Sequence, residues 1–175
     1  AIGGWESNDS IATIATSTNK ALSWILEMDN INAILQDLHF PSDTLGYTVG
    51  WSGNIWKTTD AGDNWNQLTI AGNPGTRNFN GCYFFDNQSG IVIGGNQSND
   101  SIQTILKTTD GGTNWNVISD NLGYWLNAVY FTDTQTGFAV GDGGTILKST
   151  DGGNNWTSLT LNGSVASRQF MDVYF

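Results

Sequence analysis

Basic side chains are scarce in this sequence. The 175 residues include 6 Lys and Arg against 16 Asp and Glu, which gives a formal net charge of −10. Proteins that bind nucleic acids neutralise phosphates with clusters of Lys and Arg, so the composition disfavours a nucleic-acid partner. Charged residues of both signs make up 13% of the chain, about half of the usual share. This low content also disfavours helical bundles and coiled coils.

Cysteine and long apolar segments are lacking too. Cys82 is the single cysteine of the sequence, which excludes an intrachain disulfide and a Cys-based metal site. The apolar runs are far shorter than the roughly 20 residues that cross a bilayer, so we expect no membrane insertion. The acidic residues of the repeated motifs described below stand one to a repeat, whereas a metal ion needs several converging ligands. We therefore expect neither a metal site nor a cofactor.

Glycine and tryptophan are abundant instead, with 22 and 8 residues, and both mark an internal repeat. An apolar segment flanked by glycine occurs three times, and a motif rich in Gly and Asp follows each copy. The glycine-flanked segments are Gly46–Gly50, Gly90–Gly94 and Gly137–Gly141. The motifs are Thr58–Trp65, Thr108–Trp115 and Ser149–Trp156, and a degenerate copy, Ser17–Trp24, precedes them.

The spacing of the repeat predicts its architecture. The tryptophans that end the four motifs recur at intervals of 41, 50 and 41 residues, within the range of about 40–50 residues for four-stranded propeller blades. We expect an all-β propeller of four-stranded antiparallel blades, with about four blades in this segment of a larger ring. A ring of four blades, closed by pairing Val173–Phe175 with Ala1–Gly3, is the alternative. The predicted blade repeats are 1–30, which is partial, 31–72, 73–120, 121–163 and 164–175, the first strand of a next blade.

The motif residues have a structural interpretation. An aspartate in such a turn accepts hydrogen bonds from backbone N–H groups, a glycine permits a positive φ, and a tryptophan fills the space between adjacent sheets. The degenerate copy has Asn19 and Ala21 in place of Asp and Gly, and its turn is predicted to be the weakest. Structural roles are assigned to Thr58, Asp60, Gly62, Trp65, Thr108, Asp110, Gly112, Trp115, Ser149, Asp151, Gly153 and Trp156.

The pattern Ser/Thr-x-Asp-x-Gly-x-x-Trp resembles the Asp-box, or BNR repeat, and the resemblance covers essentially the whole chain. The order of segments from Val129 to Trp156 is most similar to the photosystem II stability and assembly factor family. This resemblance implies a propeller that binds a protein client through an arginine-rich surface, whereas this sequence holds two arginines, Arg77 and Arg168. Sialidases share the motif but clamp their substrate with three arginines, so the sequence disfavours that activity.

A binding site is expected on the face that carries the loops opposite the Asp-boxes. Aromatic side chains beside Asn and Asp suit sugar rings, which stack on one face and hydrogen-bond through their hydroxyls. The alternative is that the aromatics pack between blades and that the Asn and Asp side chains stabilise turns. No residue is assigned a catalytic or metal-binding role. The binding candidates are Trp5, Glu6, Trp51, Arg77, Phe79, Asn99, Asp100, Tyr124, Trp125, Asp142 and Arg168.

The predicted function is a non-catalytic binding or scaffolding propeller that recognises a protein or glycan partner. Low lysine content, acidity and strands rich in Thr, Asn and Gly indicate a secreted or cell-surface protein. A polysaccharide-active glycoside hydrolase of the xyloglucanase-like Asp-box type is one alternative, with its carboxylates drawn from Asp37, Asp172, Glu6 and Asp100. A structural subunit of an extracellular assembly is the second. Open blade edges also predict self-association.

Overall fold

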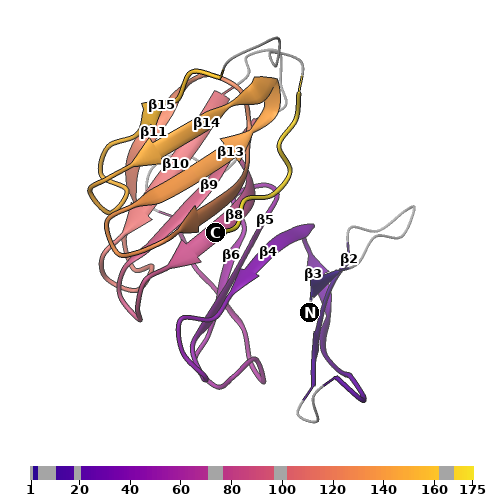
Figure 1. Ribbon diagram of the computed structural model, residues 1–175. Helices are drawn as coiled ribbons and strands as arrows, with labels where there is room; N and C mark the ends of the chain where they lie inside the picture. The colour runs from indigo at the N-terminus through magenta and orange to yellow at the C-terminus, as the bar shows by residue number, and fades with distance from the viewer. Residues whose placement is uncertain (1, 4–10, 18–20, 71–76, 97–101, 162–167) are drawn as a thin grey trace.

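The computed structural model describes residues 2–3, 11–17, 21–70, 77–96, 102–161 and 168–175, and every structural statement below concerns these ranges. They contain fifteen β-strands, one 3₁₀ turn, η1 (Asp142–Gly144), and no α-helix. The strands form four antiparallel sheets (Figure 1). The all-β class and the antiparallel blades predicted from the sequence are therefore confirmed.

Within each sheet the strands pair in chain order, as in a meander. The first sheet contains β1 (Ile2–Gly3), β2 (Ile11–Thr16) and β3 (Ile25–Asn32). The second contains β4 (Leu35–His39), β5 (Gly46–Gly50), β6 (Ile55–Thr58) and β7 (Asn66–Gln67). The third contains β8 (Asn78–Phe84), β9 (Gly90–Asn96), β10 (Ile102–Thr108) and β11 (Asn116–Leu122). The fourth contains β12 (Leu126–Phe131), β13 (Gly137–Gly141), β14 (Ile146–Ser149) and β15 (Thr157–Ser158).

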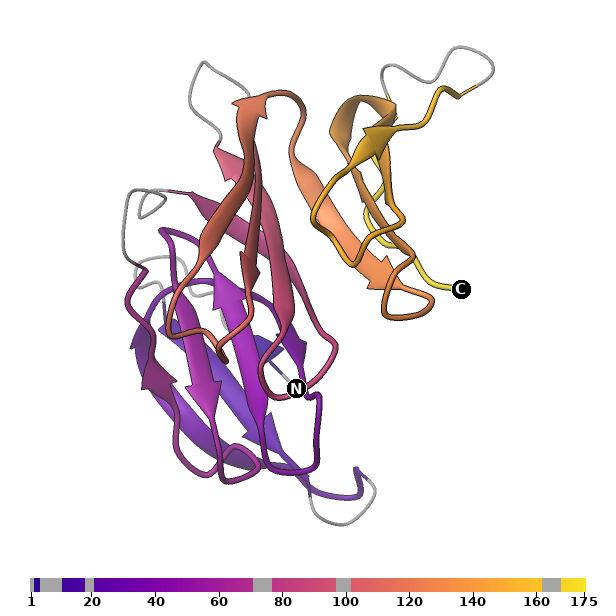
Figure 2. The ribbon, with the colours of Figure 1, turned by 90° about the vertical axis from the view of Figure 1, so that its left-hand side faces the viewer.

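The sheets follow one another side by side, and Figure 2 shows the indigo and purple sheets on one side of the molecule and the orange sheet on the other. The first strands of the second, third and fourth sheets are neighbours, because β8 contacts both β4 and β12. These three strands form one wall of the molecule. The predicted blade boundaries remain a prediction, since several of them fall outside the described ranges.

A glycine at or near the end of each second strand is required by a close approach of two backbones. Gly50, Gly94 and Gly141 lie opposite the first strand of their own sheet. A Cβ atom at any of them would collide with a carbonyl oxygen of the residue that precedes or begins that first strand. Only glycine lets the strands pair at this point, which explains why the residue recurs in every complete repeat.

Apolar side chains fill the spaces between neighbouring sheets. Between the second and third sheets, the rings of Tyr47 and Phe84 stack with centroids 3.6 Å apart and planes 3° apart. The core between these two sheets also contains Val49, Ile55, Phe79, Cys82, Val92, Leu106 and Trp115. The core between the third and fourth contains Ile91, Ile93, Ile105, Leu126, Val129, Phe131, Ala139 and Leu147. Ile14 of β2 shares a smaller cluster with Leu35 and Trp65 of the second sheet's region.

A phenylalanine and a tryptophan meet edge to face within each complete sheet. The phenylalanine stands at the end of the first strand, and the tryptophan stands just before the fourth strand. The pairs are Phe40–Trp65 with centroids 6.1 Å apart, Phe84–Trp115 at 6.2 Å and Phe131–Trp156 at 5.8 Å, and their interplanar angles are 87°, 87° and 81°. This geometry is a preferred arrangement of aromatic rings, and it ties the first strand of a sheet to its last turn.

Candidate functional site

The Asp-boxes connect the last two strands of their sheets, which are the third and fourth strands in the complete sheets, and we number them in chain order. The first box is Ser17–Trp24, the second Thr58–Trp65, the third Thr108–Trp115 and the fourth Ser149–Trp156. In the second box, Thr58 Oγ1 accepts a hydrogen bond from the Gly62 N–H at 3.0 Å and donates one to Asp60 Oδ1 at 2.7 Å. The third and fourth boxes repeat both bonds at 2.9–3.0 Å.

Each box aspartate is held by its own turn. Asp60 accepts hydrogen bonds from the backbone N–H and the side-chain amide of Asn64, both at 2.9 Å. Asp110 and Asp151 accept the equivalent bonds from Asn114 and Asn155. The asparagine side chain is the largest cause that lowers the pKa of Asp60 to about 2, and Asn155 does the same for Asp151, whose pKa is also about 2. A carboxylate stabilised as an ion by its turn is suited to capping and not to proton transfer.

The first box keeps the hydroxyl cap despite its degenerate sequence. Ser17 Oγ accepts the N–H of Ala21 at 2.9 Å, as the Thr or Ser hydroxyl does in the complete boxes. Ala21 has a positive φ of 66°, whereas the complete boxes have glycine there, with Gly112 at 85°. A side chain at such a φ is strained, so the sequence departure weakens this turn without abolishing it.

Lysines of the third strands connect the third and fourth boxes to the sheet that precedes each of them. Lys57 Nζ donates to the carbonyl oxygen of Gly111 in the third box at 2.9 Å, and Lys107 Nζ donates to Gly152 O in the fourth box at 2.8 Å. Tyr47 also donates its hydroxyl to Gly111 O at 3.2 Å. Burial is the main cause that raises the pKa of Tyr47 to about 12 and lowers that of Lys107. These side chains therefore serve the contact between sheets.

Four of the binding candidates meet at one end of the fourth sheet. The N–H of Asp142 donates to Trp125 O at 2.9 Å, and the N–H of Gly144 donates to Arg168 O at 2.8 Å. The ring of Tyr124 lies against Gly143, where a Cβ atom would collide with it. Tyr124, Trp125, Asp142 and Arg168 thus gather around η1, where loops of the fourth sheet and the 168–175 segment come together.

Trp51 and Arg77 occupy the corresponding place on the second and third sheets. The N–H of Trp51 donates to Ile34 O at 2.9 Å, and the N–H of Gly53 donates to Arg77 O at 2.7 Å. The structure therefore divides the described surface candidates into two groups. Trp51 and Arg77 form one group, and the four residues around η1 form the other.

Phe79 is not a surface residue. Its side chain has no exposed surface and belongs to the core between the second and third sheets. The physical reason is that Phe79 lies within β8, paired with Gly94, and not in a loop. The candidates Trp5, Glu6, Asn99 and Asp100 lie outside the described residues.

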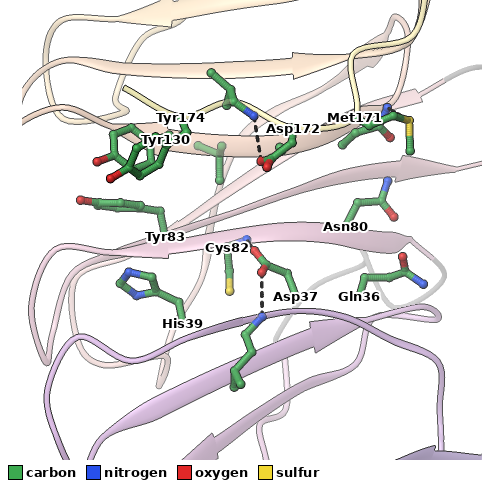
Figure 3. A pocket seen from close by; sticks show the side chains of 15 residues that line it. Gln36, Asp37, His39, Asn80, Cys82, Tyr83, Tyr130, Met171, Asp172 and Tyr174 are labelled. Atoms are coloured by element: carbon green, nitrogen blue, oxygen red, sulfur yellow. Dashed lines mark hydrogen bonds between the residues drawn. The ribbon is translucent and has the colours of Figure 1, made fainter. Parts of the chain in front are cut away.

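An open cleft of about 450 Å³ lies along the wall of first strands (Figure 3). Its lining comes from β4, β8, β12 and residues 171–174. Asp37 and Asp172, two of the carboxylates considered for a hydrolase, line this cleft. A row of aromatic rings that was not predicted from the sequence lines it too. The row consists of His39, Tyr83, Tyr130 and Tyr174, with successive centroids 5.0, 5.8 and 5.1 Å apart. The signal was present, because each of these residues precedes the phenylalanine that ends a first strand.

Amide side chains form the opposite border of the cleft and join the sheets. Asn80 Nδ2 donates to Leu126 O at 2.9 Å, and Asn127 Nδ2 donates to Phe170 O at 3.0 Å. Both bonds run from one first strand to the next segment in the wall. Two of the side chains that line the cleft are therefore fixed by hydrogen bonds to the neighbouring segment.

Asp37 lies on β4 and Asp172 lies in the 171–174 segment, the first and the last of the four segments that line the cleft. Asp37 Oδ2 accepts the N–H of Cys82 and Oδ1 accepts that of Leu38, both at 2.8 Å. Burial nevertheless raises the pKa of Asp37, and the charge of Asp172 adds to this rise. His39 Nδ1 accepts the Phe84 N–H at 3.3 Å, and burial lowers the pKa of His39. Both buried groups thus help to hold the third sheet against the second.

Two kinds of site are not found in the part of the chain that the structure describes. No three His, Cys, Asp or Glu side chains come together in a way that could hold a metal ion. Among the same residues, no helix is long and apolar enough to cross a membrane.

Comparison with known proteins relates this chain to one protein family and to solved structures of propellers. The family model of the photosynthesis system II assembly factor YCF48 matches residues 16–124 and again residues 82–171. No curated protein sequence matches the chain. Among solved structures, YCF48 bound to D1 peptide has a TM-score of 0.63 and 21% identity over 90% of this chain and 45% of that one.

Two further structures illustrate the range of the fold. YCF48 from Cyanidioschyzon merolae has a TM-score of 0.58 and 24% identity, over 72% of this chain and 39% of that one. A GH74 enzyme from Niastella koreensis has a TM-score of 0.68 and 17% identity, over 90% and 27%. The chain spans less than half the length of each of these proteins. At such low identities the structures show the fold alone, a segment of an Asp-box propeller.

The family match tests two predictions made from the sequence, the family resemblance and the location of the protein. The resemblance to the photosystem II assembly factor family is confirmed. The expectation of a secreted or cell-surface protein is wrong, because the family model that matches is that of a photosystem II assembly factor. Acidity and low lysine content reflect solubility and did not identify a compartment. The two matches together cover most of the sequence, and the chain belongs to the family of the photosynthesis system II assembly factor YCF48.

Proposed function

We propose that this chain is part of a non-catalytic, protein-binding propeller that holds a peptide of its partner in the cleft along the first strands. The observation that carries this proposal is the row of four aromatic rings along an open cleft of about 450 Å³. A related propeller, YCF48, has been solved with a D1 peptide bound, which supports a peptide as the ligand class.

The chemistry of the lining favours a peptide that carries a basic side chain. Asp37 and Asp172 line the cleft together with tyrosine rings, and no Lys or Arg is among the lining residues. A guanidinium or ammonium group gains both from a carboxylate and from the face of a tyrosine ring. Tyr174 is 80% exposed and offers its ring without any rearrangement.

The hydrolase alternative has less support in the described residues. Both oxygens of the Asp37 carboxylate accept backbone N–H groups, and the carboxylates Glu6 and Asp100 lie outside the described ranges. The likeness to the GH74 enzyme concerns the fold, and a fold of this kind hosts many functions.

Binding of a fluorescent D1 peptide, followed by anisotropy, tests the proposal. We expect Tyr130→Ala and Tyr174→Ala to weaken binding by about tenfold or more, as for aromatic anchors at the centre of an interface. Val117→Ser is the matched control, because Val117 is an exposed apolar residue on β11, outside the cleft. Binding of equal strength by all four chains would overturn the cleft as the site. Release of reducing ends from xyloglucan by the wild-type chain would instead establish the hydrolase.

A further inference from the structure

A second pocket, of about 520 Å³, opens between the third and fourth sheets at their outer strands. Its described lining includes residues of β10, β11, β14, β15 and the fourth box, and Figure 1 shows β11 and β15 at the same edge of the molecule. Both sheets contain four strands. The volume lies within the range of about 300–1,000 Å³ that is usual for sites of small molecules. The pocket shares no lining residue with the first-strand cleft.

The box tryptophan is more accessible here than in the two preceding boxes. Trp65 and Trp115 are 8% and 7% exposed, whereas Trp156 is only partly buried and lines the pocket. Its ring is nevertheless fixed, because it packs edge to face on Phe131 and its Nε1 donates to Gly153 O at 3.2 Å. Each of these tryptophans packs against the core that its sheet shares with the preceding sheet. The accessibility of Trp156 is therefore a property of the contact between the third and fourth sheets.

The sequence of the third sheet accounts for the space beside this ring. In the second sheet, Leu68 and Ile70 follow the box tryptophan by three and five residues, and both pack against the core shared with the third sheet. The residues at these two places in the third sheet are Ile118 and Asp120. Ile118 packs against the next core, but an aspartate stands where the second sheet has its second apolar residue. The contact between the third and fourth sheets thus has one apolar residue fewer at its outer side.

The lining is polar, and none of the lining residues that the structure describes is charged. It also contains the ring of Tyr124, which is 51% exposed. A sugar ring stacks its apolar face on an aromatic ring, and its hydroxyls need partners that both donate and accept hydrogen bonds. Amide and hydroxyl side chains do both. Six such side chains line the pocket, and they are Gln103, Asn154, Asn155, Ser119, Thr145 and Ser158.

Part of this polar set is held in place, and part is available to a ligand. Asn154 Oδ1 accepts a hydrogen bond from Lys107 Nζ at 2.8 Å, and Thr145 Oγ1 donates one to the carbonyl oxygen of the η1 residue Asp142 at 2.7 Å. No side-chain hydrogen bond joins Gln103 or Ser158 to another described residue. A ligand would therefore meet oriented polar groups together with two that have no other partner among the described residues.

We propose that this pocket binds a neutral oligosaccharide, one ring of which stacks on Tyr124 while Gln103 and Ser158 hydrogen-bond its hydroxyls. Trp156 supplies the apolar surface at the inner side of the pocket. A charged ligand is disfavoured, because the described lining offers no opposite charge. This site is additional to the peptide cleft proposed above.

Saturation-transfer NMR with cellotetraose, mannotetraose and maltotetraose tests the proposal, and tetragalacturonate serves as the charged comparison. We expect saturation transfer to at least one neutral probe and none to tetragalacturonate. Tyr124→Ala and Gln103→Leu are each expected to raise the Kd of that probe by about fivefold or more, because the first removes the stacking ring and the second removes hydrogen bonds at similar volume. Val117→Ser is the control, since Val117 is exposed on β11 outside the lining and this variant is expected to bind as the wild type does.

The variants also separate this site from the first-strand cleft. We expect Tyr124→Ala to keep the wild-type affinity for the D1 peptide and Tyr130→Ala to keep that for the oligosaccharide. Circular dichroism shows whether each variant keeps its sheet content. Failure of all three neutral probes to bind, stronger binding of tetragalacturonate, or unchanged affinity in folded Tyr124→Ala and Gln103→Leu chains would overturn the proposal. Loss of D1-peptide binding by Tyr124→Ala would assign the pocket to the peptide and overturn it as well.

Discussion

The first and third Asp-boxes form the same local turn in different surroundings. In both, the hydroxyl of the first residue accepts the N–H of the fifth at 2.9 Å. Trp115 of the third box is nevertheless 7% exposed, whereas Trp24 of the first box is 53% exposed. The turn is thus a local property of the sequence, while burial of the tryptophan depends on the first strand and the sheet beside it.

The largest expected difference between the two boxes comes from truncating their tryptophans. Trp115→Ala is expected to lower the free energy of unfolding by about 3–5 kcal/mol, because a large buried side chain leaves a cavity. Trp24→Ala is expected to change it by no more than about 0.5 kcal/mol, because that side chain is about half exposed. Urea denaturation of the two variants measures both values. Equal losses would mean that the first box is packed as tightly as the third.

Removal of the capping hydroxyl is expected to have the next largest effect. Thr108 is fully buried, and its hydroxyl accepts the buried N–H of Gly112. Thr108→Ala therefore leaves a buried donor without a partner and is expected to cost about 1–3 kcal/mol.

The same change in the first box is the comparison. Ser17→Ala removes a hydrogen bond in an exposed turn, where water can replace the hydroxyl, so we expect a loss below about 0.5 kcal/mol. Thr109→Ala, at an exposed position of the third box, is the control for Thr108→Ala. A large loss for Ser17→Ala in thermal denaturation would show that the local turn stabilises the first sheet more than packing does.

Substitutions at the positive-φ position of the box are expected to change the free energy of unfolding by a smaller amount. The change is expected to be an increase in the first box and a decrease in the third. Ala21 has φ 66°, and Ala21→Gly is expected to raise the free energy of unfolding by up to about 1 kcal/mol through relief of strain. Gly112 has φ 85°, and Gly112→Ala is expected to lower it by about 1–2 kcal/mol. Paired urea titrations measure both. A destabilised Ala21→Gly chain would show that the backbone entropy of glycine outweighs the strain.

The smallest expected effect is on the pH dependence of stability, to which His39 and the box aspartates contribute in different pH ranges. Burial lowers the pKa of His39 in the folded chain, so the unfolded chain binds more protons below its own pKa of about 6.5. This contribution to stability is present above that pH and is lost as the pH falls. The box aspartates, with lowered pKa values, lose theirs only below about 4.

A control variant isolates the histidine. His39→Gln keeps a hydrogen-bond acceptor but does not titrate, so its Tm is expected to fall less than that of the wild type between pH 7.5 and 5.5. Asp37 has a raised pKa and an opposite pH dependence, but it is present in both chains and its contribution cancels. Identical pH profiles for the two chains would show that His39 does not couple protonation to folding.

Repetition made most of the fold predictable from the sequence. Four copies of one turn, spaced like propeller blades, indicated the sheets, their order and the position of the boxes between third and fourth strands. These features depend on short-range patterns such as a hydroxyl four residues before a glycine. The register at Gly50, Gly94 and Gly141 follows from the same patterns, because only glycine fits opposite a neighbouring backbone.

The candidate site was less accessible to sequence reasoning. The row of His39, Tyr83, Tyr130 and Tyr174 arises from residues far apart in the chain, and only the stacking of first strands brings their rings within 5–6 Å of one another. Phe79 was placed on the surface because its position before a strand resembles a loop, whereas it lies within β8, paired with Gly94.

The sequence by itself determined the class of fold, the Asp-box turns and the glycines at the strand crossings, because each depends on residues within one hairpin. Only the tertiary structure decided which tryptophans are buried and which aromatics share a cleft. Those properties depend on the sheet that stands next in space. A repeated motif cannot specify them, since its tryptophan is buried in the third box and about half exposed in the first.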